Sequence, residues 1–205
     1  SYKAHTCKLN STLDLSMLTK LGGEFECYNN IGLSSITHSP TDEVFTKYWV
    51  HTCNLGGVYD VSMLNKLGGS FNVSTNPNLK NVTFPLSTET FANTSAGNDA
   101  IKMNGCAFSG NYVDFRPLSG ATLDTTSTFG ATVRLDDNNF TAGDINHLLD
   151  DFVKITAYNP SGWSGTTLYI GGSNSLPNTT SGGYDGQAAL NTLTGGTGYR
   201  WTIIL

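Results

Sequence analysis

The chain has 205 residues, a formal net charge of −5, and only 13% charged against 11% aromatic residues. Acidic residues outnumber basic ones by 16 to 11, which argues against a nucleic-acid-binding surface, because such a surface needs clustered lysines and arginines. The aromatic content and low charge also exclude a disordered chain and favour one folded body built of short strands and turns.

An internal similarity dominates the first half of the chain. Residues 5–25 match residues 51–71 at 13 of 21 positions, including His-Thr-Cys at the start and Leu-Gly-Gly near the end. Half of that 46-residue offset also fits, when the unit is read as apolar-x-apolar-x-x-(Asn or Cys). The sequence therefore predicts a strand and a bend every 23 residues.

Seven units fit this pattern, the last with one extra residue, and a final strand at Trp201 and Ile203 follows them. The first apolar positions and the bend positions are, in chain order, Tyr2 and Cys7, Phe25 and Asn30, Tyr48 and Cys53, Phe71 and Asn76, Ile101 and Cys106, Val133 and Asn138, and Leu168 and Asn174. We expect one domain over 1–205, with regular 23-residue turns over 1–98 and longer, irregular turns and a C-terminal unit over 99–205.

Two late segments have helical spacing. The run Thr141-Ala142-Gly143-Asp144 is typical of a capping box, and an apolar stripe follows it, so a helix over about 142–155 is predicted. A second helix is expected from about Asp185 to Leu193, ended by Gly195. Ser16–Leu18 and Ser62–Leu64 are too short for more than a turn or two.

This pattern resembles the leucine-rich repeat. The resemblance implies an α/β solenoid, with a parallel sheet on the concave face and with turns and two short helices on the convex side. The ending, from Leu168 to Ile203, looks like the C-terminal unit of leucine-rich-repeat proteins on bacterial surfaces and in bacteriophage structural proteins such as tail fibres. It implies a location on a virion surface, or extracellular on a cell surface.

Strand alternation predicts which side chains face outward from the concave sheet. Candidate binding residues on that face are Tyr28, Trp49, His51, Lys102, Arg134 and Tyr169. Aromatic side chains beside polar ones are typical of binding hot spots. Trp49 and Tyr169 could stack on sugars, and Lys102 with Arg134 could take an anionic group. The alternative is that Trp49 only stiffens the sheet.

The four cysteines do not indicate a metal site or disulfides. Cys7, Cys53 and Cys106 occupy bend positions two turns apart, which is about 10 Å at strand spacing and too far for a disulfide. We expect four free, buried thiols, no metal and no cofactor. A calcium site at Asp136–Asn139 lacks the spacing of an EF-hand loop.

Enzymatic alternatives are weaker than a binding role. His5 and His51 occupy outward positions without a nucleophile beside them, and Glu24 and Glu26 share one strand face as a glycosidase pair would. An open sheet seldom forms a water-excluding pocket, so the chain is not expected to be an enzyme.

The expected function is therefore recognition or adhesion, with a host-surface protein or glycan bound by the concave sheet. The alternative is a structural assembly component, such as a subunit of a phage fibre, shell or filament. In that case other structural subunits would bind the ends, where neither Tyr2 nor the last strand appears capped. A carbohydrate-active enzyme is the third reading. No run approaches the roughly 18 apolar residues of a membrane span, so no membrane insertion is expected.

Overall fold

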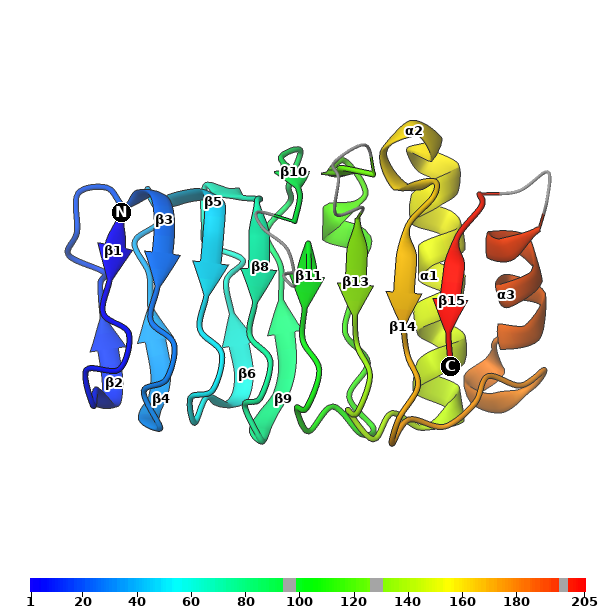
Figure 1. Ribbon diagram of the computed structural model, residues 1–205, viewed down its shortest axis with the longest axis horizontal. Coiled ribbons are helices and arrows are strands. Elements are labelled where there is room, and N and C mark those ends of the chain that lie inside the picture. The colour runs from blue at the N-terminus through cyan, green and yellow to red at the C-terminus, as the bar shows by residue number, and fades with distance from the viewer. Residues whose placement is uncertain (94–98, 126–130, 196–198) are drawn as a thin grey trace.

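Parallel strands form most of the structure. The computed structural model describes residues 1–93, 99–125, 131–195 and 199–205 and has an α/β arrangement with few helices (Figure 1). The main sheet runs in the order β1 (Tyr2–Lys3), β3 (Gly22–Glu26), β5 (Glu43–Trp49), β8 (Ser70–Asn72), β11 (Ile101–Lys102), β13 (Thr132–Arg134), β14 (Thr167–Tyr169) and β15 (Thr202–Ile204), with β7 (Lys66–Leu67) beside β5.

The register of this sheet is the one that the apolar spacing predicts. Tyr2 pairs with Phe25, Phe25 with Tyr48, and Tyr48 with Phe71. The same file continues through Ile101, Val133, Leu168 and Ile203. Each strand therefore places equivalent residues side by side, and the outward-facing residues form files of their own.

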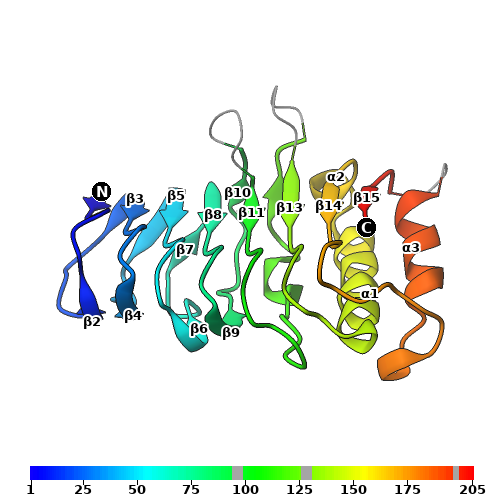
Figure 2. The same ribbon diagram turned by 60° about the horizontal axis from the view of Figure 1, so that its bottom comes forward.

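A second layer of strands lies behind the first half of the main sheet (Figure 2). It consists of two parallel pairs, β2 (Asn10–Asp14) with β4 (Gly32–Thr37) and β6 (Gly56–Asp60) with β9 (Asn78–Thr83), whereas the pair of β10 (Thr90–Phe91) and β12 (Thr122–Leu123) is bridged through Phe91 to Gly69, directly before β8 of the main sheet. The expectation that this side of the first half consists of turns is wrong for these segments. Register shifts at Ser11/Thr12 and Gly57/Val58 interrupt the period-two alternation that would have predicted strands there.

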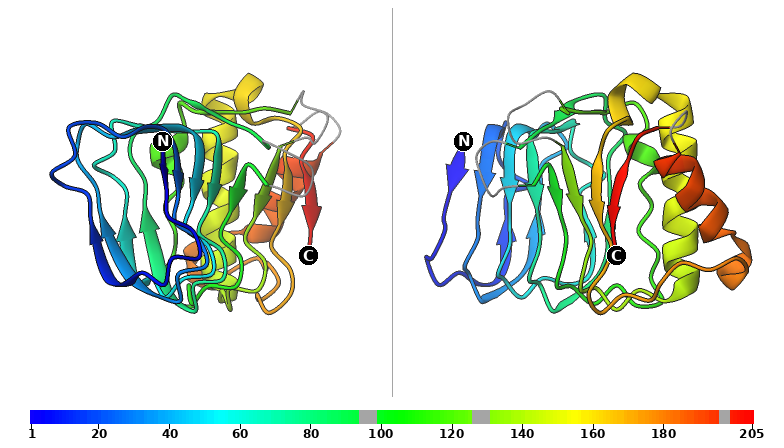
Figure 3. Two further views of the ribbon diagram at one scale, coloured as in Figure 1. Left: turned by 60° about the vertical axis from the view of Figure 1, so that its left-hand side comes forward. Right: turned by 45° about the vertical axis from the view of Figure 1, so that its right-hand side comes forward.

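Helices replace the second-layer strands in the C-terminal half (Figure 3). The two predicted helices are confirmed as α1 (Ala142–Tyr158) and α3 (Gly186–Thr194), and the capping box of Thr141 and Asp144 is present. The structure adds a third α-helix and two 3₁₀ segments that the sequence did not predict: α2 (Pro160–Trp163), η1 (Arg116–Leu118) and η2 (Ser181–Gly183). At 17 residues, α1 is also not short.

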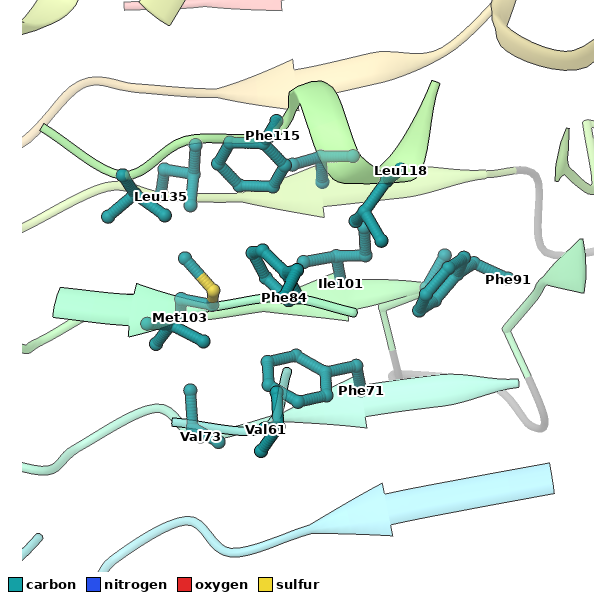
Figure 4. Close-up of a cluster of buried hydrophobic side chains, with 14 of the residues drawn as sticks. Val61, Phe71, Val73, Phe84, Phe91, Ile101, Met103, Phe115, Leu118 and Leu135 are labelled. Atoms are coloured by element: carbon teal, nitrogen blue, oxygen red, sulfur yellow. The ribbon is translucent and has the colours of Figure 1, made fainter. Parts of the chain in front are cut away.

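The apolar core between the two layers is rich in aromatic rings. Tyr2, Phe25, Tyr48 and Phe71 follow one another with ring centroids 5.2 to 5.5 Å apart. Phe71 then meets Phe84 from the second layer, and Figure 4 shows the adjoining cluster of buried side chains. Stacked rings remove large apolar areas from water, which is the main stabilising term of such a core.

Asparagine side chains occupy the bends where strands of the main sheet end. The Oδ1 of Asn30 accepts hydrogen bonds from the Cys7 and Leu9 amides, while its Nδ2 donates to the Ala4 and Cys27 carbonyls. Equivalent bonds are made by Asn76, Asn138 and Asn174. Each amide therefore ties its own bend to the bend before it and satisfies buried backbone groups that leave the sheet.

The repeated Leu-Gly-Gly motif has a steric cause. Gly23 and Gly69 both adopt positive φ, 84° and 67° respectively, where other residues are strained. At Gly69 an added Cβ would also lie 2.1 Å from the Thr46 carbonyl oxygen. At position 69, only glycine allows the backbone to lie this close to Thr46 of the neighbouring strand.

A buried polar network lies between the layers. His38 Nδ1 is 3.2 Å from Asp42 Oδ2, and His38 Nε2 is 2.6 Å from the Tyr48 hydroxyl, which in turn pairs with the Tyr59 hydroxyl. Asp42 also accepts the backbone amides of Leu21 and Ser39. Burial lowers the pKa of His38, against the opposing effect of Asp42. The imidazole is therefore held neutral inside the core.

Replacing Asn76 by alanine should lower the free energy of unfolding by about 3 kcal/mol, because the Leu55 amide and the Val50 and Val73 carbonyls lose their buried partner. Urea unfolding followed by circular dichroism measures the change. Asn78→Ala is the matched control, since Asn78 is exposed and bonds only to the Asn54 side chain. Equal losses in the two variants would contradict the role of the buried amide.

The contribution of His38 to stability should fall as the pH drops below about 6.5, opposite in sign to the contribution of Asp151, whose pKa burial raises to about 6. The unfolded chain takes up a proton at His38 near that pH, whereas the folded chain does so only at lower pH, so acid favours unfolding. His51 and His147 act in the same direction, because burial lowers their pKa values too. His38→Gln should reduce the slope of stability between pH 7 and 5; an unchanged slope would show that His38 does not titrate between the two states.

Candidate functional site

Four rings form an aromatic cluster on the outer face of the main sheet, the face turned away from the second layer. His5, Tyr28 and His51 stack in succession, with ring centroids 4.8 and 4.7 Å apart and planes within 8° of parallel. Trp49 stands beside them, 6.1 Å from Tyr28 and 6.3 Å from His51. The sheet register explains the stack, because these positions lie opposite one another on adjacent strands.

Two neighbours fix the orientation of Trp49. Its indole Nε1 donates to the Ser70 hydroxyl at 3.0 Å, and Ser70 donates in turn to the Asp99 carbonyl. The Lys47 ammonium lies 4.7 Å from the ring centroid, in a cation–π contact. Trp49 is therefore held rigidly, which reduces the conformational entropy that a binding partner would have to overcome.

Burial perturbs one of the two histidines in this cluster, His51. The pKa of His51 is lowered, first by burial and then by the nearby positive charge of Lys102. At neutral pH the ring is uncharged and carries one donor and one acceptor nitrogen. His51 Nδ1 already lies 3.1 Å from the Thr52 hydroxyl, so Nε2 is the nitrogen available to a partner.

The remaining predicted site residues form a separate charged cluster farther along the sheet. Arg134 lies 3.2 Å from Asp99 and 3.4 Å from Asp136, and its guanidinium stacks 4.0 Å from the centroid of Tyr169. Lys102 is 3.7 Å from the same Asp99 carboxylate. The two cations that the sequence offers to an anionic ligand are therefore already neutralised by carboxylates of the chain.

The sequence did not predict several residues of these clusters as site residues. Lys47 lies two positions before Trp49, and Ser70 lies two positions before Asn72. Because side chains alternate between the two faces of a strand, this spacing could have placed both residues on the outer face. Asp99 stands before β11, outside the strand pattern, so no spacing rule pointed to it. His5 was expected on the outer face, but its stacking on Tyr28 needed the register to be known.

The acid pair suggested for glycoside hydrolysis is engaged in ion pairs. Lys3 Nζ lies 2.7 Å from Glu24 and 2.9 Å from Glu26. The hydrogen bond from Lys3 lowers the pKa of Glu24, whereas a general acid needs a raised pKa. The two carboxylates therefore act as partners of one lysine on the outer face.

Within the described residues, no group of three or more histidine, cysteine, aspartate or glutamate side chains is placed to hold a metal ion. Asp136 of the segment considered for calcium pairs with Arg134, and Asp137 accepts the Ser173 amide. Across the same ranges, no helix combines the length and apolarity that crossing a membrane requires.

The cysteines are free, but one of them is exposed, contrary to the expectation of four buried thiols. The Sγ of Cys53 bonds to the Cys27 carbonyl, and that of Cys106 to the Val73 carbonyl, both in the strand before their own. Cys7 follows β1, the first strand of the sheet, and among the described residues its thiol bonds only to the His5 carbonyl two residues away. Burial raises the pKa of Cys27 and of Cys106 to about 12 and also raises that of Cys53.

A third cluster, on the helical side, was not predicted. Tyr112, His147 and Tyr184 stack with centroids 3.7 and 4.1 Å apart. The Tyr112 hydroxyl donates to Asp151, a buried carboxylate whose pKa burial raises to about 6. These contacts join α1 to the segments before η1 and α3, and all three ring positions serve that packing.

No protein-family model, curated protein or solved structure compared with the chain matches it.

The cysteines make a direct test of the first strand possible. In the native protein, a thiol reagent such as Ellman's reagent should modify Cys7 quickly and the other three thiols only after unfolding, because burial both shields them and suppresses their thiolates. Absorbance should therefore report one fast thiol out of four. Cys7→Ser should abolish the fast phase; two or more fast thiols would contradict the burial of the inner three.

Proposed function

We propose that this chain is a leucine-rich-repeat-like α/β solenoid that acts as a non-enzymatic recognition module. The 23-residue spacing of the strands, their parallel register and the asparagine bonds between successive bends support the solenoid part of the proposal. Each strand lies directly beside the strand of the next unit, as in a stack of units that each need a neighbour to bury their apolar face.

The aromatic cluster on the outer face carries the functional proposal. Tyr28, Trp49 and His51 are partly exposed, in contact with one another and held by Lys47 and Ser70. Tyrosine and tryptophan dominate binding hot spots because they offer a large rigid surface with a polar edge. Because the cluster is prearranged on an open sheet, it fits a partner whose binding surface is flat.

The covered ring faces favour a protein partner over a glycan partner. Sugar binding by stacking needs an open ring face, but both faces of Tyr28 are covered by His5 and His51. Lys47 occupies the space over the Trp49 ring. Tyr28 therefore offers no open ring face to a sugar and one face of Trp49 is occupied, which favours the backbone and side-chain groups of a protein surface as the partner.

The resemblance of the C-terminal part to bacterial surface and tail-fibre proteins suggests that the partner is a host-surface protein and that the module works on a virion or cell surface. The charged cluster contributes to specificity rather than to anion capture, because Asp99 and Asp136 neutralise Arg134. A partner side chain that displaced one of these ion pairs would have to replace both the charge and its hydrogen bonds.

A structural assembly component is the second candidate. Ile204 and Leu205 of the last strand segment are 42% and 53% exposed. At the opposite end, an apolar groove of about 480 Å³ is lined by Leu9, Ile31 and neighbouring polar residues. Docking of further subunits at these ends would leave the outer face open, so the two functions are compatible.

The outer face can be tested with peptides selected from a random display library against the native chain. Such peptides settle on prearranged hot spots, so Tyr28→Ala combined with Trp49→Ala should weaken the majority of them by about 2 kcal/mol or more. Calorimetry measures the change. Phe45→Ala is the control, since Phe45 is also an exposed aromatic, at 47%. Peptides that bind the double variant unchanged would show that the cluster is not the recognition site, and a parallel glycan array tests the sugar alternative.

A further inference from the structure

Four exposed side chains of apolar character recur at a constant step of 23 residues along one rim of the molecule. They are Met17, Pro40, Met63 and Leu86, here called the apolar file. Met17 is 92%, Met63 43% and Leu86 89% exposed, and Pro40 is exposed as well. Isolated exposed apolar residues are common on protein surfaces, but a regular row of them marks a contact surface.

Each member of the apolar file stands in the segment that leads from a second-layer strand to the main sheet. These segments form the upper edge of the molecule in Figure 1. In two of them a backbone bond closes the turn, from the Leu18 amide to Leu15 and from the Leu64 amide to Val61. The tight turn places the methionine at its third position, pointing away from the core.

Hydrogen bonds align the four segments in a straight row. Thr41 Oγ1 donates to the Thr19 carbonyl, and the Asn65 amide donates to the Asp42 carbonyl. The Ser87 hydroxyl donates to the Leu67 carbonyl. Consecutive segments therefore lie at strand spacing, about 4.8 Å apart, and the four apolar side chains span about 14 Å.

A second file runs beside the first, with charges that alternate in sign. It consists of Lys20, Glu43, Lys66 and Glu89, again at a step of 23 residues. Lys20 lies 3.0 Å from Glu43, and Lys66 lies 3.7 Å from Glu89. The Asn65 side chain donates to Glu43 and joins the two pairs.

The charges along this file alternate from positive to negative. If a second copy of the file is laid against it in the opposite direction, each positive charge faces a negative one. A two-fold axis through the middle of the row would set Lys20 opposite Glu89 of a second copy and Glu43 opposite Lys66. The same rotation would set Met17 against Leu86 and Pro40 against Met63. The file carries no net charge, so it offers nothing to an anionic lipid surface or to nucleic acid.

We infer that this rim is a self-recognition surface, by which two copies of the chain associate antiparallel through the apolar file and the alternating charges. The row is short compared with the roughly 800 Å² per partner of a standard interface, so the dimer belongs to the weak class. The rim lies apart from the aromatic cluster, and the inference does not depend on the proposed function.

Sedimentation equilibrium of the chain at increasing concentration tests the association. The mass should rise from the 21.9 kDa of one chain toward twice that value as the concentration approaches about 1 mM. Met17→Glu with Leu86→Glu should weaken association at least tenfold. Leu176→Glu, an equally drastic change at a 64% exposed residue away from the rim, should leave association unchanged.

Charge-reversed variants test the antiparallel arrangement. Glu43→Lys with Glu89→Lys makes the charged file wholly positive, and Lys20→Glu with Lys66→Glu makes it wholly negative. Each variant alone should sediment as a monomer, and an equal mixture should form a mixed dimer. Thermal melting followed by circular dichroism establishes that each variant is folded, and the single changes Glu89→Lys and Lys20→Glu replace any pair that is not. A wild type that stays monomeric to about 1 mM, or a mixture that behaves like its separate parts, would overturn the inference.

Discussion

The structure depends on buried amide side chains that replace the backbone hydrogen bonds lost where strands end. A chain that leaves a sheet at the end of each strand abandons amide and carbonyl groups inside the protein, and each costs about 1 to 3 kcal/mol if it stays unpaired. Four asparagine amides pair these groups, each with one acceptor oxygen and two N–H donors: Asn30, Asn76, Asn138 and Asn174. Each amide bonds to groups of its own bend and of the preceding bend. The cysteines between them supply a single weak donor at the same place.

This bonding fixes the register, and the register in turn arranges every surface. Because paired residues of adjacent parallel strands lie side by side, residues of one type at those paired positions form a row in space. The interior row is aromatic, the outer face carries the stacked rings of His5, Tyr28 and His51, and the rim carries methionine, proline and leucine. Three faces with different chemistry therefore arise from one alternation.

The main sheet and its register could be predicted because apolar alternation and the bend residues act locally and recur. Helices α1 and α3 were predictable for the same reason, since the capping box of α1 and the apolar spacing of both helices are local signals. The second-layer strands were not, because shifts at Ser11/Thr12 and Gly57/Val58 break their alternation. The candidate site divided into two clusters because the Asp99 carboxylate, outside the pattern, pairs with both Lys102 and Arg134, whereas Tyr28, Trp49 and His51 contact one another. Which charged side chains form ion pairs depends on the three-dimensional structure and cannot be predicted from strand spacing alone.

The shared asparagine bonds also determine how the protein would yield to mechanical force. A load that pulls on β1 acts first on the bonds from Asn30 to the Cys7 and Leu9 amides. The bend after β3 is joined to the next bend by the Cys53 thiol, and the bend after β5 is joined to the next by Asn76. Strands would thus peel from the edge one after another, and each released unit of 23 residues would lengthen the chain by about 80 Å. Under tension the chain would therefore lengthen in steps while the strands farther along stay folded.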